Sequence, residues 1–455
     1  MDLLKQVESG IVAFSSWIWG TPLLILLLGG GLYFVIYTRF SPYKYFRHAI
    51  NVLLGKYDDP DEIGEINHYE ALSTHLAATV GMGNISGVAI AIVTGGPGAI
   101  FWMWISALVG VATKFFTCSL AIMYRGKDSA GAVQGGPMYV IVEGLGKKWK
   151  PLAILFCVTG MIGVLPIFQA NQLTQAFRDV ILIPNGVQVG FASDLITGII
   201  ITVIVSIVIL GGLHRIATVA GKLVPIMVIL YFITVLIIVV LNIEVVPASF
   251  ALIFEDAFTG KAVAGGVVGS VILIGAKRAA FSNEAGIGTA PMAHGAAKTN
   301  EPIREGLVAM LGPVIDTIIV CTLTALAILI TGVWQTSEGD GVTVTLTAFD
   351  SAIPVFGKYV LIACILIFAT TSLFSLSYYG SKCWSFVFGA STTRYYEYFY
   401  VISIIVGAVS SLTAIISLID GMYALMAIPT MTSAILLSPK VLKESKAYFG
   451  RLKNK

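Results

Sequence analysis

The chain has 455 residues, of which 57% are hydrophobic and only 12% are charged. Because soluble domains carry about 25% charged residues, this composition excludes a soluble protein and predicts an all-α, polytopic membrane protein surrounded by the lipid bilayer. The formal net charge of +3 does not indicate a nucleic-acid partner. The five cysteines have no CxxC spacing and lie in or beside apolar runs, so we expect buried thiols rather than disulfides or metal ligands.

Eleven apolar runs in the chain are long enough to cross the membrane, since a spanning helix needs about 20 residues. We therefore predict 11 transmembrane helices, at residues 17–38, 72–94, 99–124, 151–177, 195–213, 217–241, 262–293, 307–333, 354–379, 396–416 and 421–437. An odd number of crossings places the two termini on opposite sides of the membrane.

The distribution of Lys and Arg indicates the orientation, because cytoplasmic loops are enriched in these residues. If the C-terminal tail is cytoplasmic, most loop Lys and Arg fall on the cytoplasmic side. Only Lys5, Arg178, Lys261 and Lys358 fall outside. We therefore expect a multi-pass protein of the cell membrane, with its N-terminus outside and its C-terminus in the cytoplasm.

The second crossing is expected to be interrupted near its middle, where Gly81, Gly83 and Asn84 lie close together. Two glycines and an Asn weaken a helix, and unwound backbone within a membrane is tolerated only inside the protein or along a cavity. Free N–H groups at the start of the second half-helix attract an anion, and free carbonyls at the end of the first attract a cation. Such a pair suits a zwitterion and a small metal ion. Close helix packing through small residues is the alternative explanation for the glycines.

The seventh crossing is expected to be interrupted near Gly275, because the apolar run stops at Ile274 and charged residues follow. The second and seventh crossings each begin a set of five, and an odd repeat length inverts the second set. Two broken helices at corresponding positions of inverted repeats indicate the binding site of a secondary transporter. The predicted organisation is an extra helix and loop at 1–71, a first repeat at 72–241, a second repeat at 242–440 and a basic tail at 441–455.

Ionisable side chains within the apolar runs are costly in lipid and are expected to face the bundle interior or to form pairs. Lys114 is expected to pair or to extend toward the interface. Glu284 is expected to pair with Arg278 or Lys277 in a structural or gating role, and Asp316 has no assigned role. Both carboxylates are also the candidates for proton coupling, which requires a titratable group in the site.

Three motifs carry a specific resemblance to a known family. Residues 95–110 read Gly-Gly-Pro-Gly-Ala-Ile-Phe-Trp-Met-Trp-Ile-Ser-Ala-Leu-Val-Gly, and residues 282–286 read Ser-Asn-Glu-Ala-Gly, followed by Ala290-Pro291 and Ala293-His294. Together with Gly-Met-Gly-Asn at 81–84, these motifs resemble the alanine or glycine:cation symporter family, the sodium:alanine symporters, over nearly the whole chain. The resemblance implies a leucine-transporter-type (LeuT) fold, in which an inverted repeat of five helices each is preceded here by one extra helix.

The resemblance also implies where the substrate binds. In this fold the broken first core helix carries Val-Gly-Leu-Gly-Asn, which matches residues 80–84 of this chain. The substrate carboxylate would then lie on the N–H groups around Met82 and Gly83. The Thr79 carbonyl would face the substrate amine or an ion, so Thr79 and Asn84 would serve either the amine or a second sodium ion.

One sodium ion is implied between the second and ninth crossings. Carbonyl groups of Ala77 and Val80 would face the hydroxyls of a Thr-Ser pair, which we assign to Thr371 and Ser372. Carbonyl and hydroxyl oxygens suit a hard monovalent cation. Hydrogen bonds from these hydroxyls to the preceding helical turn are the alternative.

The remaining site residues concern the size of the substrate. Gln169 lies in an amide-rich patch with Gln172 on the same helix face, and we expect it to contact the substrate. Amide hydrogen bonds between helices are the alternative role. Bulky neighbours such as Phe168 suit alanine or glycine better than leucine. The opposite wall is expected from the interrupted seventh crossing, at Ile274, Gly275 and Ala276.

We therefore predict a secondary active transporter rather than an enzyme: a sodium-coupled symporter of small neutral amino acids, with Na⁺ as coupling ion and no organic cofactor. A proton-coupled symporter of the same fold is the alternative. A channel requires a continuous polar pore, and an enzyme requires a nucleophile with a base, or a metal cluster, whereas the histidines here are scattered without ligand spacing. No oligomer is implied.

Overall fold

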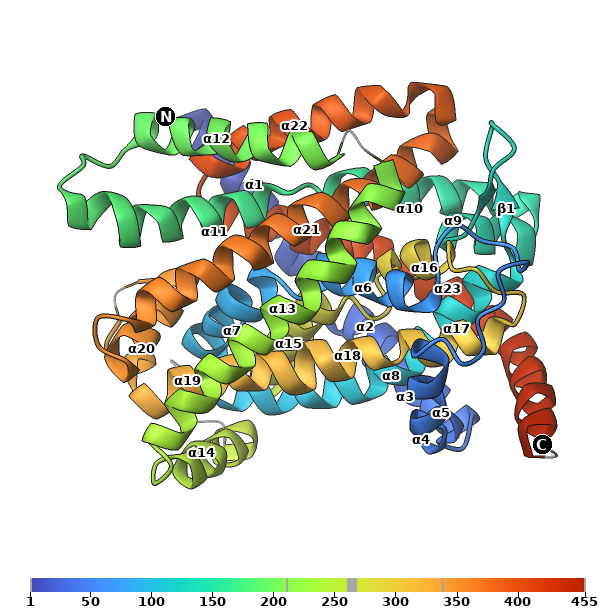
Figure 1. The fold of residues 1–455 in the computed structure, drawn as a ribbon, viewed down its shortest axis with the longest axis horizontal. Coiled ribbons are helices and arrows are strands. Elements are labelled where there is room, and N and C mark those ends of the chain that lie inside the picture. Colours follow the sequence, from blue (N-terminus) through green and yellow to red (C-terminus); the bar gives the residue numbers. More distant parts are fainter. Residues whose placement is uncertain (1, 210–211, 260–267, 338, 454–455) are drawn as a thin grey trace.

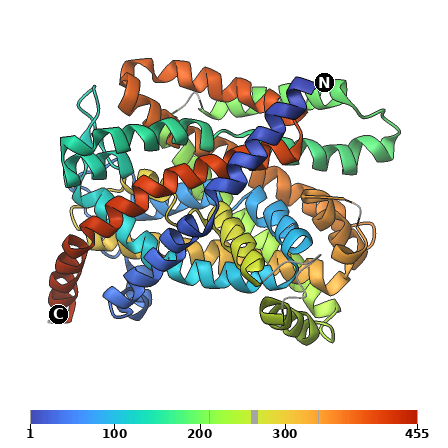
Figure 2. The same cartoon turned by 180° about the vertical axis from the view of Figure 1, so that it is seen from behind.

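The computed structural model describes residues 2–209, 212–259, 268–337 and 339–453, and these residues are mostly helical. Most of the long helices run along the long axis of the molecule (Figure 1). The first helix begins toward one end of this axis and the last helix ends at the other, as the views from front and back agree (Figures 1 and 2).

The elements of the first half include one two-stranded antiparallel hairpin and several short π-helical and 3-10 turns, labelled η. In chain order they are α1 (Asp2–Ile18), α2 (Thr21–Leu24), η1 (Ile25–Gly29), α3 (Gly30–Tyr37), α4 (Ser41–Lys44), α5 (Phe46–Leu53), α6 (His68–Thr79), α7 (Met82–Gly95), α8 (Gly98–Met123), β1 (Gly126–Lys127), β2 (Val133–Gln134), α9 (Pro137–Tyr139), η2 (Val140–Leu145), η3 (Lys147–Trp149), α10 (Lys150–Gly163), α11 (Ile167–Phe177), η4 (Arg178–Leu182), η5 (Ile183–Asn185), α12 (Phe191–Ile209) and α13 (Gly212–Leu241).

The named elements of the second half are all helices or helical turns. Its elements are α14 (Val246–Thr259), α15 (Val268–Asn283), α16 (Thr289–His294), α17 (Pro302–Ala309), α18 (Leu311–Pro313), η7 (Val314–Cys321), α19 (Thr322–Thr331), η8 (Val333–Gln335), α20 (Val342–Ala352), α21 (Gly357–Phe388), η9 (Ala390–Thr392), α22 (Thr393–Val409) and α23 (Leu412–Lys453).

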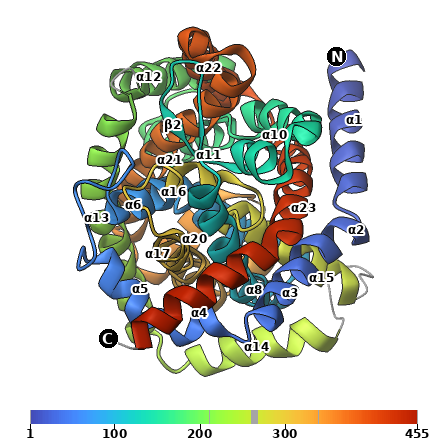
Figure 3. The same cartoon turned by 90° about the vertical axis from the view of Figure 1, so that its right-hand side faces the viewer.

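The two ends of the molecule differ in the elements they carry. The β1–β2 hairpin, α4, α5 and α9 lie at the end that holds the C-terminus, whereas α14 and α20 lie at the opposite end (Figure 1). In the view along the long axis, α1, α12, α13, α14 and α22 lie at the periphery (Figure 3). The molecule is therefore a bundle with an inner set of helices and an outer layer.

Seven helices among the described residues are long and apolar enough to cross a membrane, and nine if each of two bent pairs counts as one crossing. The expected number of 11 is therefore not confirmed. The other two expected crossings correspond to α15 with α16 and to α22, whose helices are only 16, 6 and 17 residues long. The start of the expected seventh crossing, residues 262–267, and Lys261 lie outside the described residues.

The interruption expected near Gly275 is wrong in its position. Helix α15 continues through Ile274, Gly275 and Ala276 to Asn283, and the chain leaves helical geometry only at the following residue. Helix α15 tolerates its two adjacent cations because both pair with Asp420 of α23. Its Oδ2 lies 2.8 Å from Lys277 Nζ and also contacts Arg278 Nη2. An ion pair between helices replaces the unwound backbone that the charges suggested.

Two further differences concern the ends of the bundle. Helices α14 and α20 were not expected from the apolar runs. Asp256 of α14 accepts a hydrogen bond of 2.8 Å from the Gly98 N–H at the start of α8, so α14 supports a helix terminus. The tail expected from residue 441 onward continues α23 as far as Lys453.

The outer faces of α12 and α13 are apolar, as contact with lipid requires. Their large exposed side chains repeat at helical spacing: Ile196, Ile199, Ile200, Val203, Ile204 and Ile207 on α12, and Ile226, Ile229, Phe232, Ile233, Leu236, Ile237 and Val240 on α13.

Candidate functional site

The interruption expected in the second crossing is confirmed. Helix α6 ends at Thr79, Val80 and Gly81 leave helical geometry, and α7 begins at Met82 with a bend of 42° between the two helices. The Gly81 N–H donates to Asn84 Oδ1 over 2.8 Å, so the Asn side chain caps the new helix. Gly81 packs directly against Ser372 of α21, because a Cβ there would collide with Ser372 Oγ.

Asn84 also connects this break to two other segments. Its Nδ2 donates to Ser282 Oγ of α15 over 3.2 Å and to Asp316 Oδ1 of η7 over 2.8 Å. Asp316 Oδ2 accepts from Ser282 Oγ over 2.5 Å and from Thr317 Oγ1 over 2.8 Å. All four side chains are buried. Asp316, to which the sequence assigns no role, is therefore the centre of the polar network at the break.

The second interruption lies between α15 and α16. Glu284, Gly286 and Gly288 have φ values of 56°, 85° and 112°, so the chain passes through left-handed conformations there. Glu284 Oε1 accepts from Tyr423 O–H of α23 over 2.8 Å, and Glu284 Oε2 accepts from Thr289 Oγ1. The expected pairing of Glu284 with Arg278 or Lys277 is wrong, because both cations pair with Asp420.

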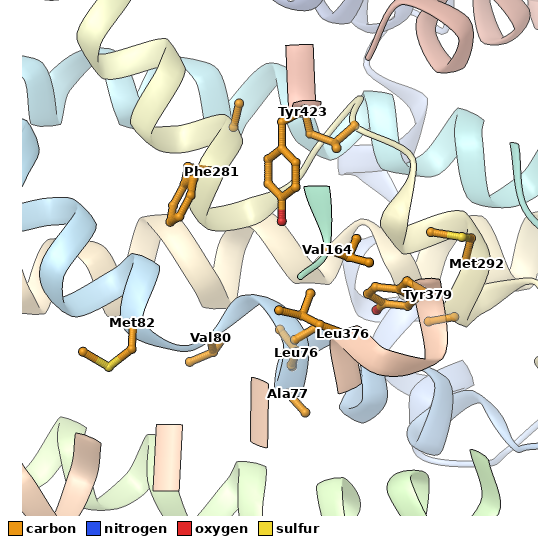
Figure 4. Packing of buried hydrophobic residues seen from close by; sticks show 14 of the residues in the cluster. Leu76, Ala77, Val80, Met82, Val164, Phe281, Met292, Leu376, Tyr379 and Tyr423 are labelled. Atoms are coloured by element: carbon orange, nitrogen blue, oxygen red, sulfur yellow. The ribbon is translucent and has the colours of Figure 1, made fainter. Parts of the chain in front are cut away.

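Aromatic rings bring the two interruptions together. A Cβ added to Gly83 would lie 3.3 Å from the Phe281 ring, so α7 and α15 pack closely at this level. The Phe281 ring centroid lies 4.9 Å from that of Phe168 and 6.0 Å from that of Tyr423. Figure 4 shows Phe281 and Tyr423 on the same side of the unwound stretch between Val80 and Met82. The rings form an apolar cover beside the first break.

The residues expected to hold sodium lie on two elements that are in contact. Ser372 Oγ donates to Phe368 O over 3.0 Å and faces Gly81, next to the expected ligand Val80. Thr371 Oγ1 donates to Ile367 O over 2.9 Å and lies 3.6 Å from Met227 Sδ of α13. Ser372 is therefore beside the break, whereas Thr371 is directed toward α13. Both hydroxyls donate to carbonyls of the preceding helical turn, which is the alternative to sodium binding.

The residues expected to bind substrate through their backbone lie on both sides of the break. Met82 and Gly83 are the first two residues of α7, where N–H groups have no acceptor within the helix. The Met82 side chain extends away from Tyr423 (Figure 4), so its contribution at this point is its backbone. Thr79 is the last residue of α6, and its hydroxyl donates to His75 O over 3.2 Å. Ala77 lies one half-turn earlier on the same helix.

The amide side chains of α11 have different roles. Asn171 Nδ2 donates to the Ser410 carbonyl after α22 over 2.8 Å, and Gln172 Oε1 accepts from the Val342 N–H of α20 over 2.9 Å. These two amides join helices, which was the alternative role. Gln169 is buried, and its Oε1 has no hydrogen-bond partner within the described part of the chain.

Ile274, Gly275 and Ala276, the expected opposite wall of the substrate site, do not lie at a helix break. A Cβ at Gly275 would lie 2.6 Å from both Ala99 O and Trp102 Cβ, so this part of α15 is packed against α8. A Cβ at Gly95 would lie 2.8 Å from Ile274 Cγ2, which places Ile274 at the far end of α7. Ala276 is buried in the same continuous helix.

A second buried polar cluster lies around α6, the helix that precedes the break. One oxygen of Glu305 contacts His68 Nδ1 of α6, and the other contacts His294 Nδ1 of α16. Further along α6, His75 Nε2 contacts Lys114 Nζ of α8, and its ring centroid lies 5.6 Å from that of His294. All five side chains are buried. Glu305 lies just before the expected eighth crossing, and its position beside an apolar run is the only signal in the sequence for this cluster.

Comparisons with known proteins agree with this architecture. The model of the sodium:alanine symporter family matches residues 4–455. An uncharacterized transporter of Haemophilus influenzae is 42% identical over 98% of this chain and 97% of its own. The sodium/alanine symporter AgcS of Methanococcus maripaludis is 38% identical over 100% of this chain and 99% of its own.

Among solved structures, MhsT in complex with L-phenylalanine superposes with a TM-score of 0.56 at 14% identity, covering 84% of this chain and 98% of that one. This likeness shows the fold, which is that of a LeuT-type transporter. The multi-pass helical bundle, its two interrupted helices and the match over almost the whole length lead to one conclusion: the chain belongs to the sodium:alanine symporter family.

Proposed function

We propose that the protein is a sodium-coupled symporter that carries small neutral amino acids, alanine and glycine, across the cell membrane by alternating access. The observation that carries the proposal is the joining of two interrupted crossings, in which Asn84 beside the first break hydrogen-bonds Ser282 and Asp316 beside the second. Membership of the family supports amino-acid symport driven by a cation, and its transporter relatives support a carrier rather than an enzyme.

The proposed topology has 11 crossings, in which α15 with α16 and α22 complete the nine counted by length. The extra helix and loop are residues 1–71, the inverted repeats are 72–241 and 242–440, and the cytoplasmic tail is 441–455. The opposite positions of the first and last helix ends support an odd number of crossings (Figures 1 and 2). The excess of Lys and Arg at the C-terminal side supports a cytoplasmic C-terminus.

The proposed substrate site uses the ends of the two half-helices. The N–H groups of Met82 and Gly83 bind the carboxylate, the Thr79 carbonyl binds the amine, and Gln169 adds a side-chain amide. The unpartnered Oε1 of Gln169 supports its part in the site. The bulky rings of Phe168 and Phe281, whose centroids lie 4.9 Å apart, favour alanine or glycine over larger substrates.

The proposed sodium site uses carbonyls of Ala77 and Val80 with the hydroxyls of Thr371 and Ser372. The contact between Gly81 and Ser372 supports this pairing of α6 with α21. A second cation fits beside Asn84, because the Asp316 carboxylate supplies a full negative charge and Ser282 a hydroxyl oxygen. Oxygen donors of this kind suit a hard cation.

Uptake by purified protein in proteoliposomes tests the function. A sodium gradient is expected to drive labelled alanine and glycine inward, and sodium and alanine are expected to raise each other's affinity because coupling between two ligands is reciprocal. Equal alanine binding in sodium and choline salts would contradict sodium coupling. Uptake driven by a proton gradient alone would support the proton-coupled alternative, for which Asp316 and Glu284 are the buried carboxylates.

Replacing Ser372 with alanine tests the sodium site. We expect the sodium concentration for half-maximal uptake to rise roughly tenfold, because a hydrogen-bonding oxygen to a charged group contributes about 1.5 kcal/mol or more. Thr371→Ala, at the second proposed hydroxyl ligand, is expected to have a smaller effect, since its hydroxyl is directed to Met227. The double variant is expected to raise the sodium requirement more sharply than either single variant, and an unchanged sodium requirement would rule out this site.

A further inference from the structure

A groove lies between the end of the first crossing and the C-terminal end of the last helix. It has a volume of about 660 Å³ and is lined by residues of α3, α4 and α23 and the turns that adjoin them. The Tyr45 and Phe449 rings stack in it at 3.9 Å between centroids and 5° between planes. The two sides of the groove are therefore held together by an aromatic contact rather than by charge.

Two cations, Arg39 and Lys446, line the groove from opposite sides. Both side chains are exposed, and within the described part of the chain neither makes an ion pair or a side-chain hydrogen bond. Hydroxyl groups of Ser41 and Ser445 line the same groove and add further donors. The groove thus offers two free positive charges and hydroxyl donors but no carboxylate among its lining residues.

The surrounding charge reinforces this positive potential. The segments 39–47 and 440–450 contain six cations in all, including the two that line the groove. Their one acidic residue is Glu444. The cations are Arg39, Lys44, Arg47, Lys440, Lys443 and Lys446. An anion at the groove is therefore attracted by more charges than the two that line it.

The groove lies where an apolar surface ends. Ile36 and Phe40 are 61% and 57% exposed on either side of Arg39, and Ile25 and Leu32 continue the exposed apolar face along the first crossing. Leu436 on α23 is also exposed, just before the part of that helix that lines the groove. Apolar exposure that changes to cationic exposure over one turn marks the boundary between acyl chains and headgroups.

We propose that this groove binds the headgroup of an anionic glycerophospholipid from the adjoining leaflet. The phosphodiester lies between the Arg39 guanidinium and the Lys446 ammonium, with the serine hydroxyls as additional donors. The acyl chains lie along the exposed apolar faces of α3 and α23. A lipid fits better than free phosphate because the apolar face and the cations are continuous, and clusters of cations at a membrane boundary attract anionic lipid.

Native mass spectrometry of the detergent-solubilised full chain tests the proposal, with phosphatidylglycerol and phosphatidylcholine as the two probes. We expect one phosphatidylglycerol to be retained at least tenfold more tightly than phosphatidylcholine. The double variant Arg39→Gln with Lys446→Gln is expected to lose this preference. Arg47→Gln with Lys443→Gln removes the same amount of charge outside the groove and is expected to keep the preference for phosphatidylglycerol. Arg39→Lys with Lys446→Arg keeps both charges in the groove and is also expected to keep this preference.

Each contrary outcome overturns the proposal. Equal retention of the two lipids, or equal phosphatidylglycerol retention by the groove variant and its charge-matched control, excludes a specific site. Complete displacement of phosphatidylglycerol by millimolar inorganic phosphate shows an anion site that does not recognise the lipid. Because the measurement uses no amino acid and no sodium gradient, its failure leaves the proposed transport function untouched.

Discussion

Replacing Glu305 with alanine is expected to lower the free energy of unfolding by about 3–5 kcal/mol, the cost of removing one partner from a buried charged pair. The Glu305 side chain is fully buried, and its two oxygens contact His68 of α6 and His294 of α16. Its removal leaves two buried imidazoles without their acceptor and separates three segments. Unfolding in a denaturing-detergent titration, together with the thermal midpoint, measures the loss.

The matched control is Glu301→Ala at the start of the same helix. Glu301 pairs with Arg451 over 2.7 Å, but the two side chains are 23% and 57% exposed, so its removal is expected to cost at most about 1 kcal/mol. Glu305→Gln keeps one acceptor and is expected to fall between the two. Equal stability of the Glu305 and Glu301 alanine variants would show that the buried histidine contacts contribute nothing.

Replacing Asp316 with asparagine is expected to raise the sodium concentration for half-maximal uptake roughly ten- to a hundredfold, because a charged oxygen partner contributes about 1.5–3 kcal/mol. The asparagine also presents a donor where Asn84 Nδ2 and Ser282 Oγ now donate to carboxylate oxygens. The variant therefore loses both the charge beside the first break and one of the hydrogen bonds that hold α7 against α15.

Asp350→Asn is the control for this prediction. Asp350, near the end of α20, is 38% exposed and pairs at 3.4 Å with Lys358, near the start of α21. Its replacement is expected to leave the sodium requirement unchanged. If Asp316→Asn alters only the pH dependence of uptake and not its sodium dependence, the carboxylate serves a proton rather than a sodium ion.

The first interruption was predictable from the sequence because three helix-weakening residues fall within one apolar run. Gly81, Gly83 and Asn84 act locally: the glycines permit close contact with α21 and α15, and Asn84 caps the helix that restarts. Information of this kind is contained in neighbouring residues, so no knowledge of the tertiary structure is needed to find it.

The second interruption was misplaced because its position depends on a distant partner. Lys277 and Arg278 resemble a polar break when only the segment is considered, yet Asp420, more than 140 residues later, allows the helix to continue through them. The actual break follows Asn283, where Gly286 and Gly288 adopt positive φ. These glycines were noted only as part of a motif.

The backbone positions of the site were predictable from the sequence, but the directions of its side chains were not. Backbone positions around residues 79–84 follow from the first break, whereas the direction of a side chain depends on packing. Asn171 and Gln172 lie beside Gln169 in sequence, but their partners on α22 and α20 fix them as links between helices. Asp316 had no local signal of its role, because its partners other than the adjacent Thr317 come from α7 and α15.

Helix α23 extends from Leu412 to Lys453 and contains Pro429 and Pro439. Near one end its Asp420 pairs with the two adjacent cations of α15, and Tyr423 hydrogen-bonds the second interruption. Near the other end it faces the first crossing at Phe449. The helix therefore connects the Asp420 ion pair to the opposite end of the bundle, and each proline, by removing a backbone hydrogen bond, gives it a position at which it can bend.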